Sequence, residues 1–293
     1  MKTVLPTSEN SLQFYNYLTS AVAPRPICFA STIDNDGLPN LSPFSFFTIV
    51  GNQPPMLVFS TLRRMRNGTT KHTYENVKAN SEVVINVVTS DIVEQASLSS
   101  CEYPDGTDEF LKAGFTKLAS DFVKPFRVAE SPVQIECKVV QVIDTSDKPG
   151  AGSLILCEVL AIHINPAILN EDETIDPHAI KLVARMGKNY YSRAFGEAVF
   201  EVEKPNVKLG IGFDGLPENI RNSTILTGND LAKLANVTAL PEPEPGFYDE
   251  HIKKTIEYYI LMPDELEVEL HRYARKMLAD NRVEHAWQVL LSV

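Results

Sequence analysis

Residues 26–50 read PICFASTIDNDGLPNLSPFSFFTIV and combine the features of a β-hairpin. Two runs rich in Ile, Phe and Val occupy positions 26–33 and 38–50, and such residues are enriched in strands. Between them stands DNDG at positions 34–37, and an Asp-Gly pair flanked by strand-like runs is a strong signal for a tight turn. The stretch therefore predicts two antiparallel strands.

Further strand-like segments follow at short intervals. They are PPMLVFST (54–61), EVVINVVTS (82–90), VQIECKVVQVI (133–143) and SLILCEVLAIHI (153–164). Short helices are predicted at residues 11–22, 71–81, 92–98 and 109–113. Closely spaced strands with short interruptions favour an antiparallel barrel over a parallel sheet. We therefore predict a mainly β domain with flanking helices over residues 10–195.

The remainder of the chain, residues 196–293, has a different character. Its segment ALPEPEPGF, at positions 239–247, is rich in Pro and Glu and predicts a stiff, extended hinge. After the hinge, apolar residues such as Leu266, Leu270 and Met277 recur on one side of a helical pattern. We predict a mostly helical C-terminal extension.

Composition limits the partners of this protein. The 293 residues carry a formal net charge of −11, which repels nucleic acid and anionic membranes, so we expect neither as a partner. No apolar run approaches the roughly 18 residues of a membrane span, and the N-terminus lacks a secretory signal. The four cysteines have no zinc-binding spacing, and Cys28, Cys137 and Cys157 lie in apolar runs. We therefore predict a cytoplasmic protein without a metal site.

One basic cluster stands out in this acidic chain, STLRRMRNGTTKHTYEN at positions 60–76. Guanidinium groups, backbone N–H groups and a helix N-terminus are good phosphate ligands. Gly68 permits a tight turn, and Thr69 or Thr70 is expected to cap the following helix. The candidate phosphate ligands are Arg63, Arg64, Arg66, Lys71, His72 and Thr73. From charge and spacing alone, a solvated basic loop that binds no phosphate is an equally good interpretation.

Together, residues 23–50, 54–61 and 71–89 resemble the flavin reductase-like family, which are flavoproteins with an FMN-binding split barrel. The resemblance lies in Pro-Arg-Pro before a strand that ends in Ser-Thr, then Asn-Leu-Ser-Pro-Phe-Ser-Phe-Phe, Pro-Pro, Phe-Ser and a Lys-His-Thr triplet after the arginines. It covers about residues 12–195. It implies a six-stranded Greek-key barrel, usually a homodimer, with FMN at the subunit interface.

The resemblance also implies which residues surround the flavin. Arg63 or Arg64, with the Lys and Thr of the Lys-His-Thr triplet, would bind the phosphate, and His72 stands where the family commonly has Asp. The isoalloxazine ring would lie along residues 41–47. The implied cofactor-binding residues are Ser31, Thr32, Leu41, Ser42, Ser45, Ser60, Thr61, Arg63, Arg64, Lys71, His72, Thr73, Arg185 and Tyr190. No acid, base or nucleophile is implied, because the flavin carries the chemistry.

The activity that the resemblance implies is a hydride transfer from NAD(P)H to flavin N5. The reduced flavin would then pass electrons to free flavin, oxygen or another small-molecule acceptor. Two alternatives stay open. One is an FMN-binding electron carrier or interaction module without reductase turnover, and the other is a related split barrel that binds another phosphorylated cofactor, such as pyridoxal phosphate. The helical extension could embrace a partner subunit, cover the flavin or recruit another protein.

Several residues have a structural and a functional interpretation. Phe44, Phe46 and Phe47 are core residues or a wall of the flavin site. Asn86, a polar residue in an apolar run, makes either a core hydrogen bond or a flavin contact.

Two further patterns imitate functional sites. GIGFDG, at positions 210–215, matches the dinucleotide-binding fingerprint, but no βαβ frame surrounds it, so we expect no nucleotide there. His163, like the other histidines outside the basic cluster, has no carboxylate or second histidine at metal-binding spacing in the sequence. We therefore expect it to be a surface histidine or one with a satisfied hydrogen bond.

Overall fold

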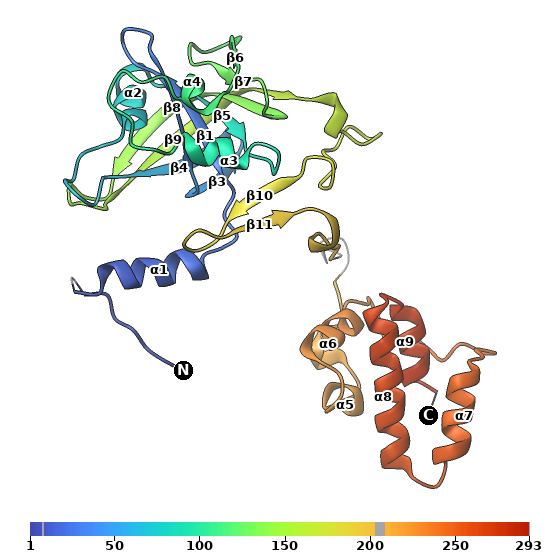
Figure 1. Ribbon diagram of the computed structural model, residues 1–293. Helices are drawn as coiled ribbons and strands as arrows, with labels where there is room; N and C mark the ends of the chain where they lie inside the picture. Colours follow the sequence, from blue (N-terminus) through green and yellow to red (C-terminus); the bar gives the residue numbers. More distant parts are fainter. Residues whose placement is uncertain (8, 203–208, 293) are drawn as a thin grey trace. The chain divides into compact units, whose positions relative to one another are not determined.

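The computed structural model describes residues 1–7, 9–202 and 209–292 (Figure 1). The chain divides into two compact units, Met1–Phe200 and Glu201–Val293. No helix within the described ranges has the length and apolar character needed to cross a membrane. The basic cluster and the residues implied to surround a flavin all lie in the first unit.

Within the described residues, the first unit is built around a seven-stranded antiparallel sheet (Figure 1). The strands are β1 (Cys28–Ile33), β2 (Pro39–Phe44), β3 (Phe47–Asn52), β4 (Pro55–Leu62), β5 (Glu82–Val87), β8 (Val133–Asp144) and β9 (Gly152–Ile164). Their spatial order is β2-β1-β5-β8-β9-β4-β3. The hairpin predicted from DNDG is confirmed, because Cys28 pairs with Phe44 and Ile33 pairs with Pro39.

One strand prediction was wrong, because residues 38–50 form two strands. β2 pairs with β1, while β3 pairs with β4 at the opposite edge of the sheet. The chain changes edges at Ser45 and Phe46, where the Phe46 carbonyl accepts a hydrogen bond from the Ser60 N–H at 2.8 Å. The sheet therefore has seven strands where the resemblance implied six, and the break falls within LSPFSFF.

The sheet interior confirms two sequence interpretations. Cys28, Cys137 and Cys157 are free thiols that lie fully buried in one apolar cluster, and burial raises the pKa of each thiol. They are packing residues, since the thiolate is the reactive form. Asn86 makes core hydrogen bonds, because its Nδ2 donates to the Phe29 carbonyl at 3.0 Å and its Oδ1 accepts from the Val128 N–H at 2.9 Å.

Short helices and strands flank the sheet. They are α1 (Ser11–Ala21), α2 (His72–Asn80), α3 (Val93–Leu98), α4 (Glu109–Ala113), β6 (Lys117–Leu118), β7 (Arg127–Val128), the 3-10 turn η1 (Pro166–Ile168), β10 (Leu182–Arg185), β11 (Tyr191–Ala194) and η2 (Gly196–Ala198). The predicted Thr cap of α2 was wrong, because Lys71 is the N-cap residue and makes no side-chain cap bond. Arg64 instead takes the Thr69 hydroxyl and the Thr70 carbonyl as acceptors.

The second unit is helical. It contains η3 (Phe213–Gly215), α5 (Glu218–Arg221), α6 (Gly228–Ala235), α7 (Glu250–Tyr259), α8 (Pro263–Ala279) and α9 (Val283–Leu290) around a core that includes Leu278 and Trp287. GIGFDG ends in the 3-10 turn η3 and does not open a long helix. The Pro-rich segment 239–247 connects α6 to α7, and Gln288 of α9 bonds the Glu242 carbonyl and the Glu244 N–H. That segment is thereby fastened to the helical core.

Candidate functional site

A small cavity of about 30 Å³ gathers several residues of the basic cluster. Its lining combines the start of α2, strand β2 and the segment 99–109 that precedes α4. Five of the implied cofactor-binding residues line it, namely Ser42, Arg64, Lys71, His72 and Thr73. Cations and a hydroxyl at the first turn of a helix form a suitable site for an anion.

Arg64 is held in place by the loop that follows β4. Gly68 adopts a φ of 70°, and its N–H donates to the Arg64 carbonyl at 2.8 Å, which closes the loop. The guanidinium then donates to the Thr69 hydroxyl at 3.1 Å and to the Thr70 carbonyl. Because the loop fixes this side chain, little rotamer entropy would remain to be lost on binding an anion.

Lys71 is a cation with reduced solvation. Burial lowers the pKa of Lys71, and the nearby Arg64 lowers it further, whereas Glu102 raises it. The ammonium lies 5.5 Å from the centre of the Phe44 ring, within cation–π range. A partly buried cation of this kind gains from an anionic partner, since charge interactions are stronger away from bulk water.

A buried network of amides and hydroxyls supports the cavity. Asn40 donates from Nδ2 to the Thr73 hydroxyl at 2.9 Å and to the Thr32 hydroxyl at 3.4 Å. Asn76 also donates to Thr32, at 3.1 Å. Thr32, which was implied to contact the flavin, therefore accepts hydrogen bonds from Asn40 and Asn76 and holds the Asn40 side chain in place. Asn40 was missed as a site residue, although the Asn of Asn-Leu-Ser-Pro-Phe was the available signal.

A second, larger cavity of about 530 Å³ adjoins the first, because Ser100 lines both. It is lined by the end of β2, by α3 and by the β10–β11 hairpin. Two implied residues, Ser45 and Arg185, line it, together with Phe44, which also belongs to the core cluster. Phe44 is therefore a core residue that also lines this cavity. The two cavities are neighbours: Arg64 and Lys71 line the smaller one, and Phe44 and Tyr191 line the larger one together with Arg185 and other polar side chains.

The remaining implied residues lie outside the lining of both cavities. Leu41 is fully buried, and its N–H donates to Glu109 Oε2 at 3.1 Å. Arg63 donates from Nη1 to the Gly68 carbonyl at 3.2 Å. Tyr190 is exposed, while its neighbour Tyr191 lines the larger cavity. Ser31, Ser60 and Thr61 are buried in β1 and β4.

Acidic residues near the cations were not predicted from the sequence. Glu102 lies at the small cavity, 3.6 Å from Arg64 Nε and 3.5 Å from Arg66 Nη2. Glu109 lines the same cavity, and burial raises its pKa although the Leu41 N–H opposes the shift. Because Glu109 bonds the backbone of the edge strand β2, it fixes the segment that ends at the larger cavity.

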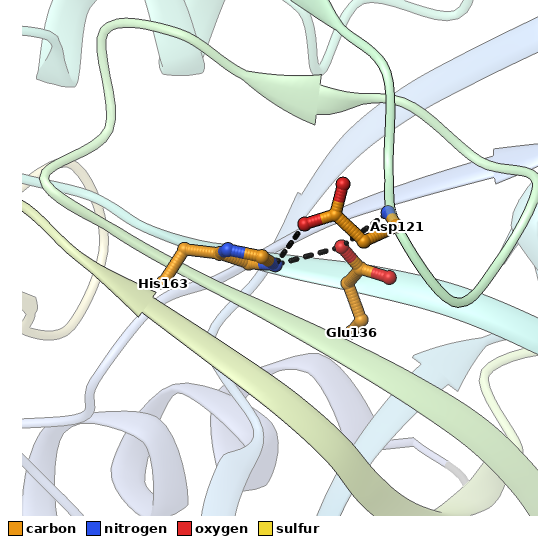
Figure 2. A group of neighbouring side chains, drawn as sticks. All are labelled: Asp121, Glu136 and His163. Carbon is orange, nitrogen blue, oxygen red and sulfur yellow. Dashed lines mark hydrogen bonds and ion pairs between the residues drawn. The ribbon is translucent and has the colours of Figure 1, made fainter.

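The satisfied hydrogen bond expected for His163 is confirmed, and its partner is a carboxylate that the sequence spacing did not indicate (Figure 2). Its Nε2 lies 2.7 Å from Glu136 Oε1 and 3.9 Å from Asp121 Oδ2. Glu136 is fully buried and also accepts N–H groups of residues 121–123 at 2.6–3.2 Å, with Arg127 Nε at 3.8 Å. Although burial opposes it, these bonds lower the pKa of Glu136. The cluster fastens the 121–123 turn to β8 and β9.

Comparison with known proteins places the first unit in a family. The model of the flavin reductase like domain matches residues 20–183. A protein of Aquifex aeolicus is 37% identical over 188 residues, which cover 64% of this chain and 93% of the relative. A protein of Halalkalibacterium halodurans is 34% identical over 203 residues, covering 69% and 96%.

Solved structures share the fold of this unit. Component B of nitrilotriacetate monooxygenase from Bacillus cereus gives a TM-score of 0.64 at 24% identity and covers 69% of this chain and 98% of its own. The 2-nitrobenzoate 2-nitroreductase of Pseudomonas fluorescens gives 0.60 at 25%, covering 69% and 96%. A flavin reductase with a split barrel domain from Shewanella frigidimarina gives 0.58 at 22%, covering 69% and 100%. The predicted split-barrel fold class is confirmed.

Proposed function

Because the chain belongs to the flavin reductase like domain family, we propose that it is an FMN-dependent oxidoreductase that takes a hydride from NAD(P)H. The electrons would pass to free flavin, oxygen or another small acceptor. The nitroreductase of Pseudomonas fluorescens, which shares the fold, supports an oxidoreductase reaction of this general class. The NAD(P)H requirement and the acceptor are parts of the proposal.

One observation carries the proposal, namely two neighbouring cavities, a small one lined by cations and a larger one with aromatic rings and polar groups in its lining. The small cavity has Arg64, Lys71 and Thr73, a donor set suited to a phosphomonoester. The larger cavity offers about 530 Å³ beside the rings of Phe44 and Tyr191, with polar groups of Ser45, Arg185 and Asn189 in its lining, which suits a flat ring with polar edges. FMN has these two ends, joined by a ribityl chain, so the residues present fit this cofactor.

FMN, when bound, would supply a hydride acceptor and an electron donor, and the chain's residues would bind and orient it. Arg64 and Lys71 would neutralise the phosphate, and the Thr73 hydroxyl, which already accepts from Asn40, is free to donate its proton to a phosphate oxygen. The Glu109 carboxylate would keep β2 in place beside the ring through the Leu41 N–H. Positioning and charge are thus the contributions of the protein.

Assembly and location belong to the same proposal. We infer a homodimer in the cytoplasm. The edge strand β3 exposes apolar side chains, with Ile49 74% exposed and Val50 also exposed, and such a strand favours coverage by another chain. The four free cysteines are compatible with a reducing compartment.

The test compares two lysines at opposite ends of one helix. Lys71→Ala removes the partly buried cation at the start of α2, and Lys78→Ala removes an exposed one in its last turn. We expect Lys71→Ala to weaken FMN binding by about tenfold to a hundredfold, the range for a charged hydrogen bond, while Lys78→Ala changes it little. Flavin fluorescence titrations would measure both dissociation constants.

Two further measurements separate the alternatives. Riboflavin lacks the phosphate, so its affinity should be equal in wild type and Lys71→Ala. If pyridoxal phosphate binds and FMN does not, the flavin proposal is wrong. If FMN binds but NADH and NADPH are not consumed under air, the protein is a carrier and not a reductase.

A further inference from the structure

The cations of the candidate phosphate site already have an anionic partner within the chain. The two carboxylate oxygens of Glu102 face two different guanidiniums, Oε1 at 3.6 Å from Arg64 Nε and Oε2 at 3.5 Å from Arg66 Nη2. The Arg64 side chain is only 18% exposed, whereas that of Glu102 is 55% exposed. The arginine is therefore fixed, and the glutamate is the member of the pair that can withdraw into solvent.

Glu102 also lies at the place where a phosphate would bind. It lines the cavity of about 30 Å³ with Arg64 and Lys71. Its carboxylate therefore lies in the same cavity as the cations that would bind a phosphate. The segment around Glu102 carries a second acid on the same side, since Asp105 Oδ1 lies 3.8 Å from His72 Nε2.

We propose that Glu102 is an internal competitor for the flavin phosphate, which keeps FMN exchangeable. This inference rests on the function proposed above. In the free protein the carboxylate occupies the anion position beside Arg64, and a bound phosphate would have to displace it or tolerate a like charge nearby. Either way, part of the attraction between the cations and the phosphate is offset. The protein would then release FMN readily and treat it as a substrate that comes and goes.

The competition predicts a variant that binds FMN more tightly than the natural protein. Glu102→Gln keeps the shape of the side chain and removes its charge, so the guanidiniums lose their competing anion. We expect the FMN dissociation constant to fall by about tenfold, mainly through slower release, because one charge near a half-solvated phosphate is worth about one pKa unit. Stopped-flow flavin fluorescence would measure the release rate.

Controls separate competition from a change in structure. Glu171→Gln makes the same charge change at an exposed position outside both cavity linings and should leave FMN binding unchanged. Riboflavin affinity should be equal in wild type and Glu102→Gln.

Three outcomes would overturn the inference. Equal FMN constants in wild type and Glu102→Gln would overturn it while leaving the proposed function intact. An equal gain for riboflavin would replace competition at the phosphate with a general structural effect. If the wild type binds no FMN at all, the proposed function fails, and the inference fails with it.

Discussion

The two compact units differ in what they bury. In the first unit, polar side chains are buried along β1, β2, α2, β5 and β8, with Asn40, Thr73 and Glu136 among them. Among the described residues of the second unit, His271 is the one polar or charged residue in the most buried class, and its Nδ1 meets the Ser223 hydroxyl at 2.8 Å. The first unit buries polar groups beside its apolar clusters, whereas the second has an almost entirely apolar core.

This difference indicates which unit positions a ligand and which one contributes stability through packing. A buried polar group costs free energy unless it is hydrogen-bonded, so a core gains little from such groups by themselves. In the first unit, Asn40 and Glu109 connect the sheet to the cavity lining, which gives these groups a positioning role. In the second unit, the core around Trp287 packs the helices together, and its polar cluster of Asp249, Tyr273 and His285 caps α7 and lines neither cavity of the first unit. We expect ligand chemistry in the first unit and stability alone from the second unit's core.

The largest expected effect tests the buried polar groups of the first unit. Glu136→Ala removes a fully buried carboxylate and leaves the N–H groups of Asp121, Phe122 and Val123 and the imidazole of His163 without their acceptor. We expect a loss of about 4 kcal/mol in the free energy of unfolding, the scale for breaking a buried pair.

Urea unfolding followed by far-UV circular dichroism would measure this loss. Asp121→Ala is the matched control, because it removes the exposed carboxylate of the same cluster and should cost less than about 1 kcal/mol. Equal effects of the two substitutions would contradict the view that the buried Glu136 organises this turn.

Local signals explain why most of the first unit was predictable. Each strand carries its own apolar pattern, and DNDG marks its turn without help from distant residues. The break at Ser45 and Phe46 carries no such signal, because it depends on β2 and β3 choosing partners at opposite edges of the sheet. The apolar pattern of a segment identifies it as a strand but does not indicate which strand it pairs with.

The site was predictable only in part for a similar reason. Charge identified the basic cluster, but the choice of Arg64 over Arg63 depends on where successive side chains point. Glu102 comes from a later loop. The pair of Glu136 and His163 also depends on register, since a shift between β8 and β9 begins at Glu136. These contacts are tertiary, and a single sequence leaves them open.

The apolar core of the second unit gives a smaller expected effect. Leu278 is fully buried in α8, so Leu278→Ala should cost about 3 kcal/mol through lost burial and the cavity left behind. Trp287 is the single tryptophan of the chain and lies in the same cluster, so its fluorescence reports this loss directly.

The same variant sharpens the comparison between the units. If the second unit's core serves stability alone, Leu278→Ala should leave the FMN dissociation constant unchanged under conditions where the protein is folded. A change in FMN affinity of more than about threefold would indicate that the helical core takes part in binding.

The smallest effect concerns a charged cluster in the second unit. Asp249 caps α7 through the N–H groups of His251 and Ile252 at 2.8 and 3.1 Å, and its Oδ2 accepts from Tyr273 and His285, both at 2.8 Å. Burial alone would raise its pKa, but these donors outweigh it and lower the pKa of Asp249. Asp249→Ala should therefore cost about 1–2 kcal/mol at neutral pH, as for a lost helix cap.

The sign of the pH dependence follows from the lowered pKa. The folded state holds the Asp249 proton less tightly than the unfolded state, so the stabilisation is complete above the unfolded value of about 3.9 and is lost as the pH falls through the lower folded value. The difference between wild type and Asp249→Ala should shrink below about pH 4. Asp249→Asn keeps a capping oxygen without the charge, so it should cost less and lack this acid-dependent part. If its cost in Trp287-monitored urea unfolding equals that of Asp249→Ala at pH 7, the cap contributes nothing and the charge contributes everything.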